Sequence, residues 1–194
     1  MHAYYNAITK RLKKLADYEI NPNMALVSFF MCAKTDEEAR QRADGATFFQ
    51  FALRFYGASK DRKRPAPGAV NMWDEYNAWK RANPDAQEAA LRGGLIGSPE
   101  TIRRKLAKFE TSHIDQVILL NQAGKNSHEH ICESLELFAK EVMPEFQGHH
   151  AEQEAWKAGV MSGETLLEEI ETAAFRDRFG KAMPGELRKV GGSA

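Results

Sequence analysis

The sequence has few cysteines, no long apolar run and no excess of charge of either sign. Cys32 and Cys132 are the only cysteines in 194 residues, too few for a disulfide framework. No apolar segment approaches the ~20 residues of a membrane-spanning helix, and the N-terminus lacks the layout of a signal peptide. Basic and acidic residues number 27 each, so no global field favours nucleic acid or an anionic membrane. We therefore expect a cytoplasmic protein with neither partner.

The histidines and cysteines do not fall at the spacing of a metal site. His128 and His130 are two residues apart on a predicted helix, so their side chains diverge by roughly 200°. No cysteine or carboxylate completes a zinc-binding pattern around them. Cys132 lies beside Ile131 within the same helix, which favours a buried structural thiol over a nucleophile. The sequence therefore predicts no metal site.

Three apolar segments are typical of strands in a parallel sheet. Met24–Ala33 is a nearly unbroken apolar run between turn residues, as expected of a strand covered on both faces. Leu95-Ile96 and Ile114–Leu120 are shorter segments of the same kind. Helical patterns separate the three. This alternation predicts an α/β fold with crossover connections.

The intervening helices begin with recognisable caps. Thr35 with Glu38 forms a capping box for a helix that we expect to run to about Tyr56. Ser98 precedes Pro99 and so predicts the start of the helix after the second strand. Asn126 with Glu129 predicts the start of the last helix of the region, which ends near Pro144. Each helix thus has a local start signal.

The rest of the chain gives weaker patterns. Tyr4–Glu19 has an apolar stripe that predicts an amphipathic helix, and a tail after Phe146 has a helical pattern at Glu164–Phe179. Residues 57–71 have the prolines and glycine of a loop, and Asn71–Arg81 reads as a helix. On that helix Trp73, Tyr76 and Trp79 share one face. They could form a substrate lid or a dimer patch, but core packing is the simpler interpretation.

Three motifs together resemble the closing units of the luciferase-like flavin monooxygenases. They are a helix start at Gly97–Ile102, a strand at His113–Leu119 and a helix ending in Phe-Ala-Lys-Glu-Val-Met-Pro within Ser134–Phe146. The connecting segment Asn121–Cys132 is also similar to the last strand-to-helix loop of that family. The resemblance covers about residues 94–146 and is looser before them.

The resemblance implies the C-terminal part of a TIM (β/α)8 barrel, about three β/α units long. Residues 1–146 would hold barrel strands six to eight with a helical insertion at about 57–91, and residues 147–194 a helical tail. Three strands cannot close a barrel of eight. We therefore expect an unpaired apolar edge at the Met24–Ala33 strand and an exposed inner face. The chain would then be either a fragment of a longer polypeptide or a sheet completed by a second copy or a complementing chain.

In such a barrel the reactive groups lie in the loops at the carboxyl ends of the strands. The resemblance thus points to Gly97, Ser98, Gln122 and Gly124 as cofactor contacts. Gly97 and Ser98 could hold a phosphate or the flavin edge at a helix N-terminus, although Ser98 could equally only cap its helix. Gln122 could touch flavin or substrate, while Gly124 could simply be required by a turn. No catalytic residue can be carried over.

The implied function is an oxidoreductase in which reduced FMN and oxygen oxidise a small organic substrate, with a separate reductase supplying the electrons. A deazaflavin-dependent oxidoreductase of the same superfamily is one alternative. Another is a shortened, non-catalytic relative that binds flavin or a partner chain. A third is a truncated product without activity. Of these, the monooxygenase is the interpretation that the resemblance favours.

Overall fold

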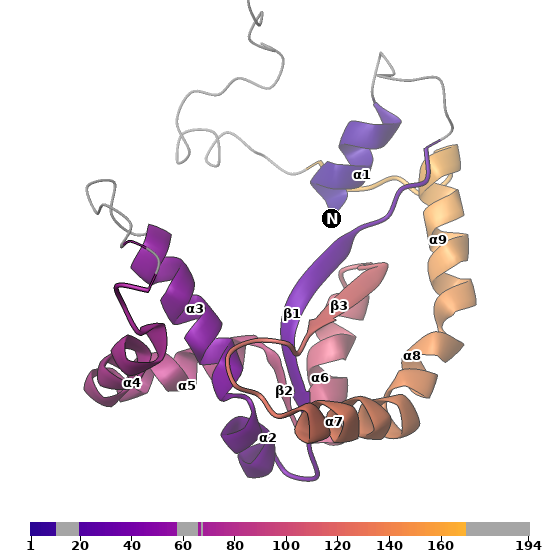
Figure 1. Ribbon diagram of the computed structural model, residues 1–194. Helices are drawn as coiled ribbons and strands as arrows, with labels where there is room; N and C mark the ends of the chain where they lie inside the picture. Colours follow the sequence, from indigo (N-terminus) through magenta and orange to yellow (C-terminus); the bar gives the residue numbers. More distant parts are fainter. Residues whose placement is uncertain (11–19, 58–65, 67, 170–194) are drawn as a thin grey trace, which may run out of the picture. The chain divides into compact units, whose positions relative to one another are not determined.

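A computed structural model describes residues 1–10, 20–57, 66 and 68–169 of the chain. These residues belong to two compact units, Asn23–Ala155 on the one hand and Met1–Pro22 with the chain from Trp156 onwards on the other (Figure 1). The predicted boundary at residue 146 falls inside a helix, Met143–Gly148, of the larger unit. Each unit is described by itself below.

The larger unit is built on a sheet of three parallel strands, in agreement with the three predicted segments. They are β1 (Ala25–Cys32), β2 (Leu95–Gly97) and β3 (Gln116–Leu120). β1 pairs with β3 through its first five residues and with β2 through its last three. The strand order is therefore β2-β1-β3, and the mixed α/β class predicted from the sequence is confirmed.

Helices connect the strands and follow the last one. Those between β1 and β2 are α2 (Asp36–Arg42), α3 (Asp44–Gly57), α4 (Met72–Ala82) and α5 (Pro84–Gly93). Between β2 and β3 lies α6 (Pro99–Glu110). After β3 come α7 (His128–Glu141), α8 (Met143–Gly148) and α9 (His150–Ser162). No helix among the described residues has the length and apolar character needed to cross a membrane.

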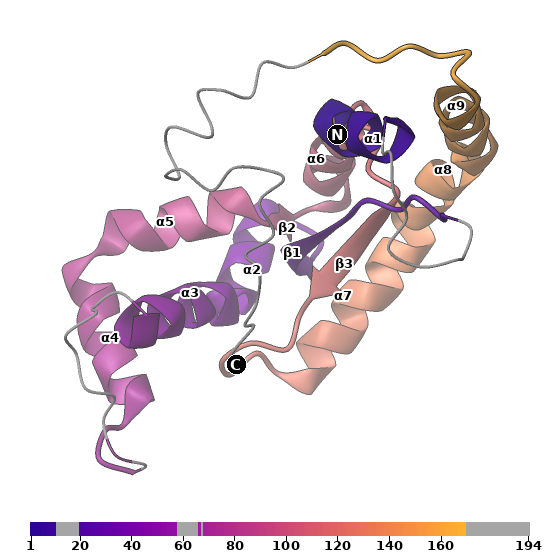
Figure 2. The same cartoon turned by 90° about the horizontal axis from the view of Figure 1, so that it is seen from above.

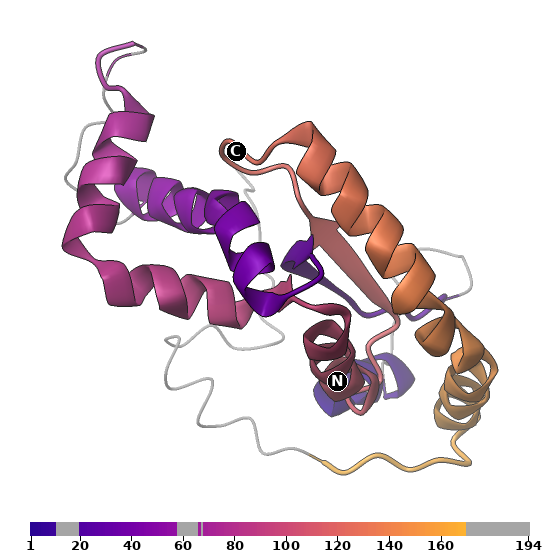
Figure 3. The same cartoon turned by 90° about the horizontal axis from the view of Figure 1, so that it is seen from below.

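Alternate residues of β1 enter two separate apolar cores. Met31 packs with Ile96 and with small residues of α2 and α3, whereas Phe30 and Cys32 pack with residues of α6 and α7. Viewed from above and from below, α3–α5 lie on one side of the strands and α7 on the other (Figures 2 and 3). At Phe30–Cys32 the sheet is thus the middle layer of three, which explains why this end of the Met24–Ala33 run has no polar face.

This arrangement differs from the barrel that the sequence resemblance implies. In a barrel, the seventh strand would lie between the sixth and the eighth, and all helices would cover the outer face. Here β1, the expected sixth strand, lies between the other two, so the predicted unpaired edge at Met24–Ala33 is wrong. Helices cover both faces of its last residues, Phe30–Cys32. The crossover from β1 to β2 and the crossover from β2 to β3 run across the sheet in opposite directions. Because both are expected to be right-handed, their helices lie on opposite faces, so the two differences have one origin.

The helix starts agree with the predictions except in two places. Thr35 and Ser98 cap α2 and α6, accepting hydrogen bonds from Glu38 N and Thr101 N. The predicted single helix from Thr35 to Tyr56 is wrong, because it breaks at Ala43 into α2 and α3. Ser127 rather than Asn126 caps α7, since its Oγ accepts from His130 N. The Asn126 side chain instead bonds the start of α3, a contact that local sequence does not reveal.

The aromatic face of α4 packs inside the larger unit, as its simpler interpretation predicts. Tyr76 is fully buried, and its ring lies 5.4 Å from Phe48 and 5.7 Å from Phe51 of α3. Trp73 and Trp79 contact the same two phenylalanines. Burial of these large aromatic rings stabilises the contact between the two helices. The face therefore packs against α3, with Tyr76 at its buried centre.

The smaller unit contains α1 (His2–Thr9), and its Tyr5 ring meets Trp156 edge to face at 5.3 Å. The rest of the predicted Tyr4–Glu19 helix, residues 11–19, lies outside the described residues. The predicted helix at Glu164–Phe179 is wrong for residues 164–169, and residues 170–179 lie outside the described part. Gly163, in the left-handed conformation (φ 85°), ends α9 instead.

One buried hydrogen bond anchors α7 to β1 beyond the end of β3. Ser134 Oγ accepts from Cys32 N at 2.6 Å, and both residues are buried. Ser134→Ala would leave this backbone N–H without an acceptor and lower the free energy of unfolding by about 1–3 kcal/mol. Urea unfolding followed by circular dichroism measures the loss. The exposed Ser112→Ala is the control and should change it by less than about 0.5 kcal/mol. Equal effects of the two substitutions would contradict the role of Ser134.

Candidate functional site

The loops at the carboxyl ends of the strands form the candidate site. In open α/β sheets, ligands bind beyond these ends where the strand order reverses. Because β2 and β3 lie on opposite sides of β1, the reversal here falls between β1 and β3. The residues that follow these two strands are Ala33–Thr35 and Asn121–Asn126. The candidate site therefore lies between α2 and α7.

Two adjoining cavities of about 450 and 500 Å³ occupy this edge, and both are lined by Glu38 and Arg42. We call them together the carboxyl-edge crevice. The first extends from Cys32 along α7, and the second reaches Trp73 and the loop at Lys125. Each alone is within the size range of small-molecule sites.

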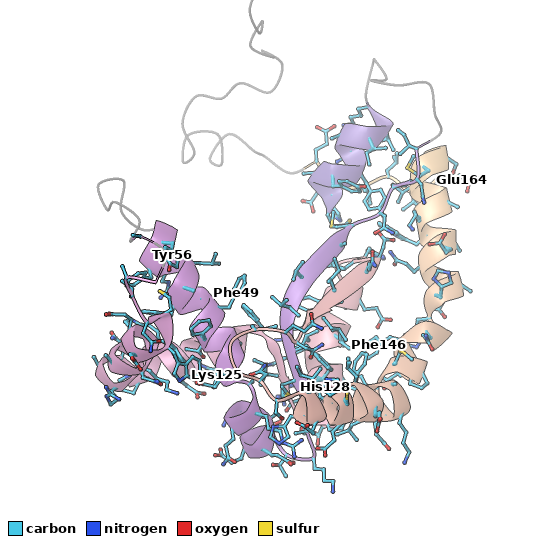
Figure 4. All side chains as sticks on the ribbon, viewed as in Figure 1. Phe49, Tyr56, Lys125, His128, Phe146 and Glu164 are labelled. Atoms are coloured by element: carbon cyan, nitrogen blue, oxygen red, sulfur yellow. The ribbon has the colours of Figure 1, made fainter. Side chains whose placement is uncertain are left out.

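Paired charges cross the crevice. Arg42 bonds Glu38 at 2.5 Å and Glu133 at 2.7 Å, so its guanidinium links α2 to α7. Lys125 Nζ lies 4.6 Å above the Trp73 ring, and Figure 4 shows Lys125 on the loop that leads to α7. Cations and carboxylates thus balance one another, and the crevice has no strong field of one sign. It fits a ligand whose binding depends on shape and hydrogen bonds.

A carboxylate of the protein occupies the place predicted for a phosphate beside Gly97 and Ser98. Asp36 Oδ1 accepts from Ser98 N at 2.7 Å, and Oδ2 accepts from Thr101 Oγ1 at 2.9 Å. The bond from Ser98 N is the main reason that the pKa of Asp36 lies below its usual value. Because a negative charge already stands at the N-terminus of α6, a phosphate there would be repelled. Gly97 and Ser98 therefore connect α6 to α2.

Gly124 also has a structural role. Its φ is 62°, and a Cβ at this position would lie 2.9 Å from the Cα of Gly45. A Cβ at Gly45 would in turn lie 1.9 Å from the carbonyl oxygen of Ala123. The two glycines let the loop after β3 dock on the first turn of α3. Gln122, the neighbour of this contact, is exposed at the edge of the sheet.

Asn121 is a candidate site residue that the sequence analysis did not select. It follows the last residue of β3 and is only 8% exposed. Its Oδ1 has no hydrogen-bond partner among the described residues, while its Nδ2 donates a long bond of 3.4 Å to Leu119 O. A buried acceptor without a donor costs free energy and suggests a role. The sequence signal that could have pointed to Asn121 is an amide side chain directly after an apolar strand.

Neither cysteine has the setting of a nucleophile. Burial raises the pKa of the Cys32 thiol to about 11, so it stays protonated at neutral pH. Cys132 is half-buried rather than buried as predicted, with its Sγ 3.6 Å from His128 Nε2 one turn earlier on α7. That contact joins neighbours on one helix and is not directed into the crevice cavities, whose linings do not include Cys132.

A scan of the chain against models of protein families finds no match. A search of curated proteins likewise finds no relative.

Asp36→Asn should lower the free energy of unfolding by about 1 kcal/mol at pH 7, because the charge at the start of α6 is lost. The folded pKa is depressed, so the stabilisation is present above the usual value of 3.8 and is lost as pH falls through the folded pKa. Urea unfolding at pH 7, 5 and 3 should show the difference from wild type shrinking below pH 4. Glu100→Gln is the control: it removes an exposed carboxylate from the first turn of α6 and should have a smaller effect on the free energy of unfolding. A pH-independent difference would contradict the charge effect.

Proposed function

We propose that this chain is the C-terminal part of a luciferase-like flavin-dependent monooxygenase. In this proposal, reduced FMN from a separate reductase and molecular oxygen oxidise a small organic substrate. The observation that carries it is that the residues of the resemblance form two successive β/α units, β2-α6 and β3-α7, with their loops at one edge of a parallel sheet. That is the placement the chemistry of a barrel enzyme requires.

Residues at the end of β3 have the chemistry to hold a flavin. The buried Asn121 Oδ1 needs a donor, and a flavin ring offers one in its imide N–H. Gln122 is beside it, and Lys125 adds a cation at the rim for the phosphate. A bound reduced flavin would itself supply the electrons for oxygen chemistry. The chain's residues would orient it and exclude water.

The strand order sets a condition on the proposal. In a complete barrel β2 would lie between β1 and β3, so β3 would have to leave β1 when complementing strands are present. The β1–β3 ladder involves only five residue pairs. The proposed complement would provide new pairs for the strands and would cover apolar surface that is exposed here.

We expect the chain to bind FMN saturably but with a Kd above about 1 µM, because it supplies only part of the walls of a flavin site. Quenching of FMN fluorescence measures this, since Trp73 lines the crevice. Lys125→Ala should weaken binding about threefold by removing a surface charge pair with the phosphate. Lys108→Ala, at an exposed site on α6, should not.

Riboflavin lacks the phosphate, so its Kd for wild type should equal the Kd of FMN for Lys125→Ala. Sub-micromolar binding would overturn the argument that walls are missing. Absence of saturable binding, or no effect of Lys125→Ala, would overturn the proposed flavin site. Tighter binding of a deazaflavin than of FMN would favour the deazaflavin-dependent alternative.

A second candidate function, binding of a partner chain, is favoured by an exposed apolar face. Val27 and Ile118 are paired neighbours on β1 and β3 and are 61% and 46% exposed. Leu53, on α3, is 60% exposed. Phe49 of α3 lies 5.5 Å from Phe29 of β1, and Figure 4 shows it on the side of α3 toward that strand. Large apolar residues in such a group usually mark an interaction surface.

We propose that this face associates with a second copy or a complementing chain. Light scattering after size-exclusion chromatography should show dimers or larger species at micromolar concentration. Val27→Asp should shift the protein to monomers, because a charge on the face would be desolvated in the complex. Leu135→Asp, at a partly exposed site on α7, is the control. A monomeric wild type would contradict association with a second copy, and equal effects of the two substitutions would contradict the role of this face.

A further inference from the structure

A third cavity, of about 580 Å³, lies on the α6–α7 side of the sheet near the beginning of β3. We call it the α6–α8 cavity. Its walls are apolar side chains from α6, β3 with the residue segment before it, α7 and α8: Leu106, Phe109, Ile114, Val117, Phe138 and Phe146. Figure 4 marks Phe146 on α8. Three phenylalanines from three different helices thus contribute to one hollow.

The charged groups at the rim already have partners. Glu110 Oε1 and His149 Nδ1 are 2.7 Å apart and join the end of α6 to the end of α8. Gln153 contacts His113 Nδ1 through its Oε1 at 3.0 Å, and its Nε2 donates to Asp115 Oδ1 at 3.4 Å. Asp115 Oδ2 also accepts from Met24 N. These bonds pair Glu110, His149 and Asp115 within the protein and hold this part of the rim in place.

The cavity is separate from the carboxyl-edge crevice. It is lined by Gln116 and Val117, the first two residues of β3, whereas the crevice lies beyond the last. Val117 belongs to the core beneath α6 and α7, while the next residue, Ile118, points to the other face of the sheet. A ligand in one site therefore would not touch the other.

We propose that the α6–α8 cavity binds a neutral, apolar small molecule with a ring or short alkyl body and one hydrogen-bonding group. The volume is that of a small-ligand site and exceeds what a single side chain could fill. Water against the phenylalanine walls would find few polar partners there, so its displacement from that part of the cavity by an apolar body is favourable. The amides of Gln116 and Gln147 line the same cavity and would bond the polar group.

N-Phenyl-1-naphthylamine, a neutral apolar molecule whose fluorescence rises on leaving water, is the probe for this site. Titration of the full chain should give one saturable site with a Kd on the order of 10 µM. Ile114→Trp and Met143→Trp each place a larger ring in the cavity and should weaken binding at least about tenfold. Two variants on different elements are used because one of them could disturb folding, which circular dichroism would reveal.

Ile118→Gln is the matched control, because it removes apolar surface from the opposite face of the sheet. It should leave the Kd within about twofold of wild type, since that side chain does not line the cavity. Weakening by Ile118→Gln with no effect of either folded tryptophan variant would place the probe on the exposed sheet face and overturn the proposal. Absence of saturable binding to wild type would also overturn it.

Discussion

The structure of the larger unit depends on β1, the one strand that pairs with both others. Phe30, Met31, Cys32 and Ala33 are at most 2% exposed, and successive side chains enter opposite cores. Both cores therefore need this strand, and its two ladders fix where β2 and β3 lie. Where β3 ends its pairing, Ser134 supplies an acceptor to the backbone of β1. A change in this strand would disturb two layers at once.

The same constraint shapes the carboxyl-edge crevice of this three-stranded sheet. With β2 and β3 on either side of β1, the loops after β1 and β3 diverge and leave the carboxyl-edge crevice between α2 and α7. Asp36 stabilises the start of α6 on one side of β1, and the Gly45–Gly124 contact fixes the loop after β3 on the other. The buried amide of Asn121 follows the end of β3, and its Oδ1 is one of the buried polar atoms without a hydrogen-bond partner among the described residues.

The two faces of the sheet differ in how far helices cover them. On the face toward α6 and α7, helices pack over β3 and the α6–α8 cavity lies between them and the strand. On the other face, Val27 and Ile118 are exposed. The proposed partner would cover that second face, and the proposed small ligand would fill the first. Because the two surfaces lie on opposite sides of the same strands, substitutions can address each without touching the other.

Local signals in the sequence determined the strands, their parallel class and the caps at Thr35 and Ser98, because hydrophobic runs and N-caps act over a few residues. They did not determine the order β2-β1-β3, since pairing joins residues up to 91 apart, as Ala25 and Gln116 are. Nor did they show that Asp36 would occupy the N-terminus of α6 or that Asn126 would bond α3 instead of capping α7. The motif residues were found from sequence, but only the tertiary structure decided which of them bond the protein itself. Hydrogen-bond partners from distant segments become available only when the layers pack.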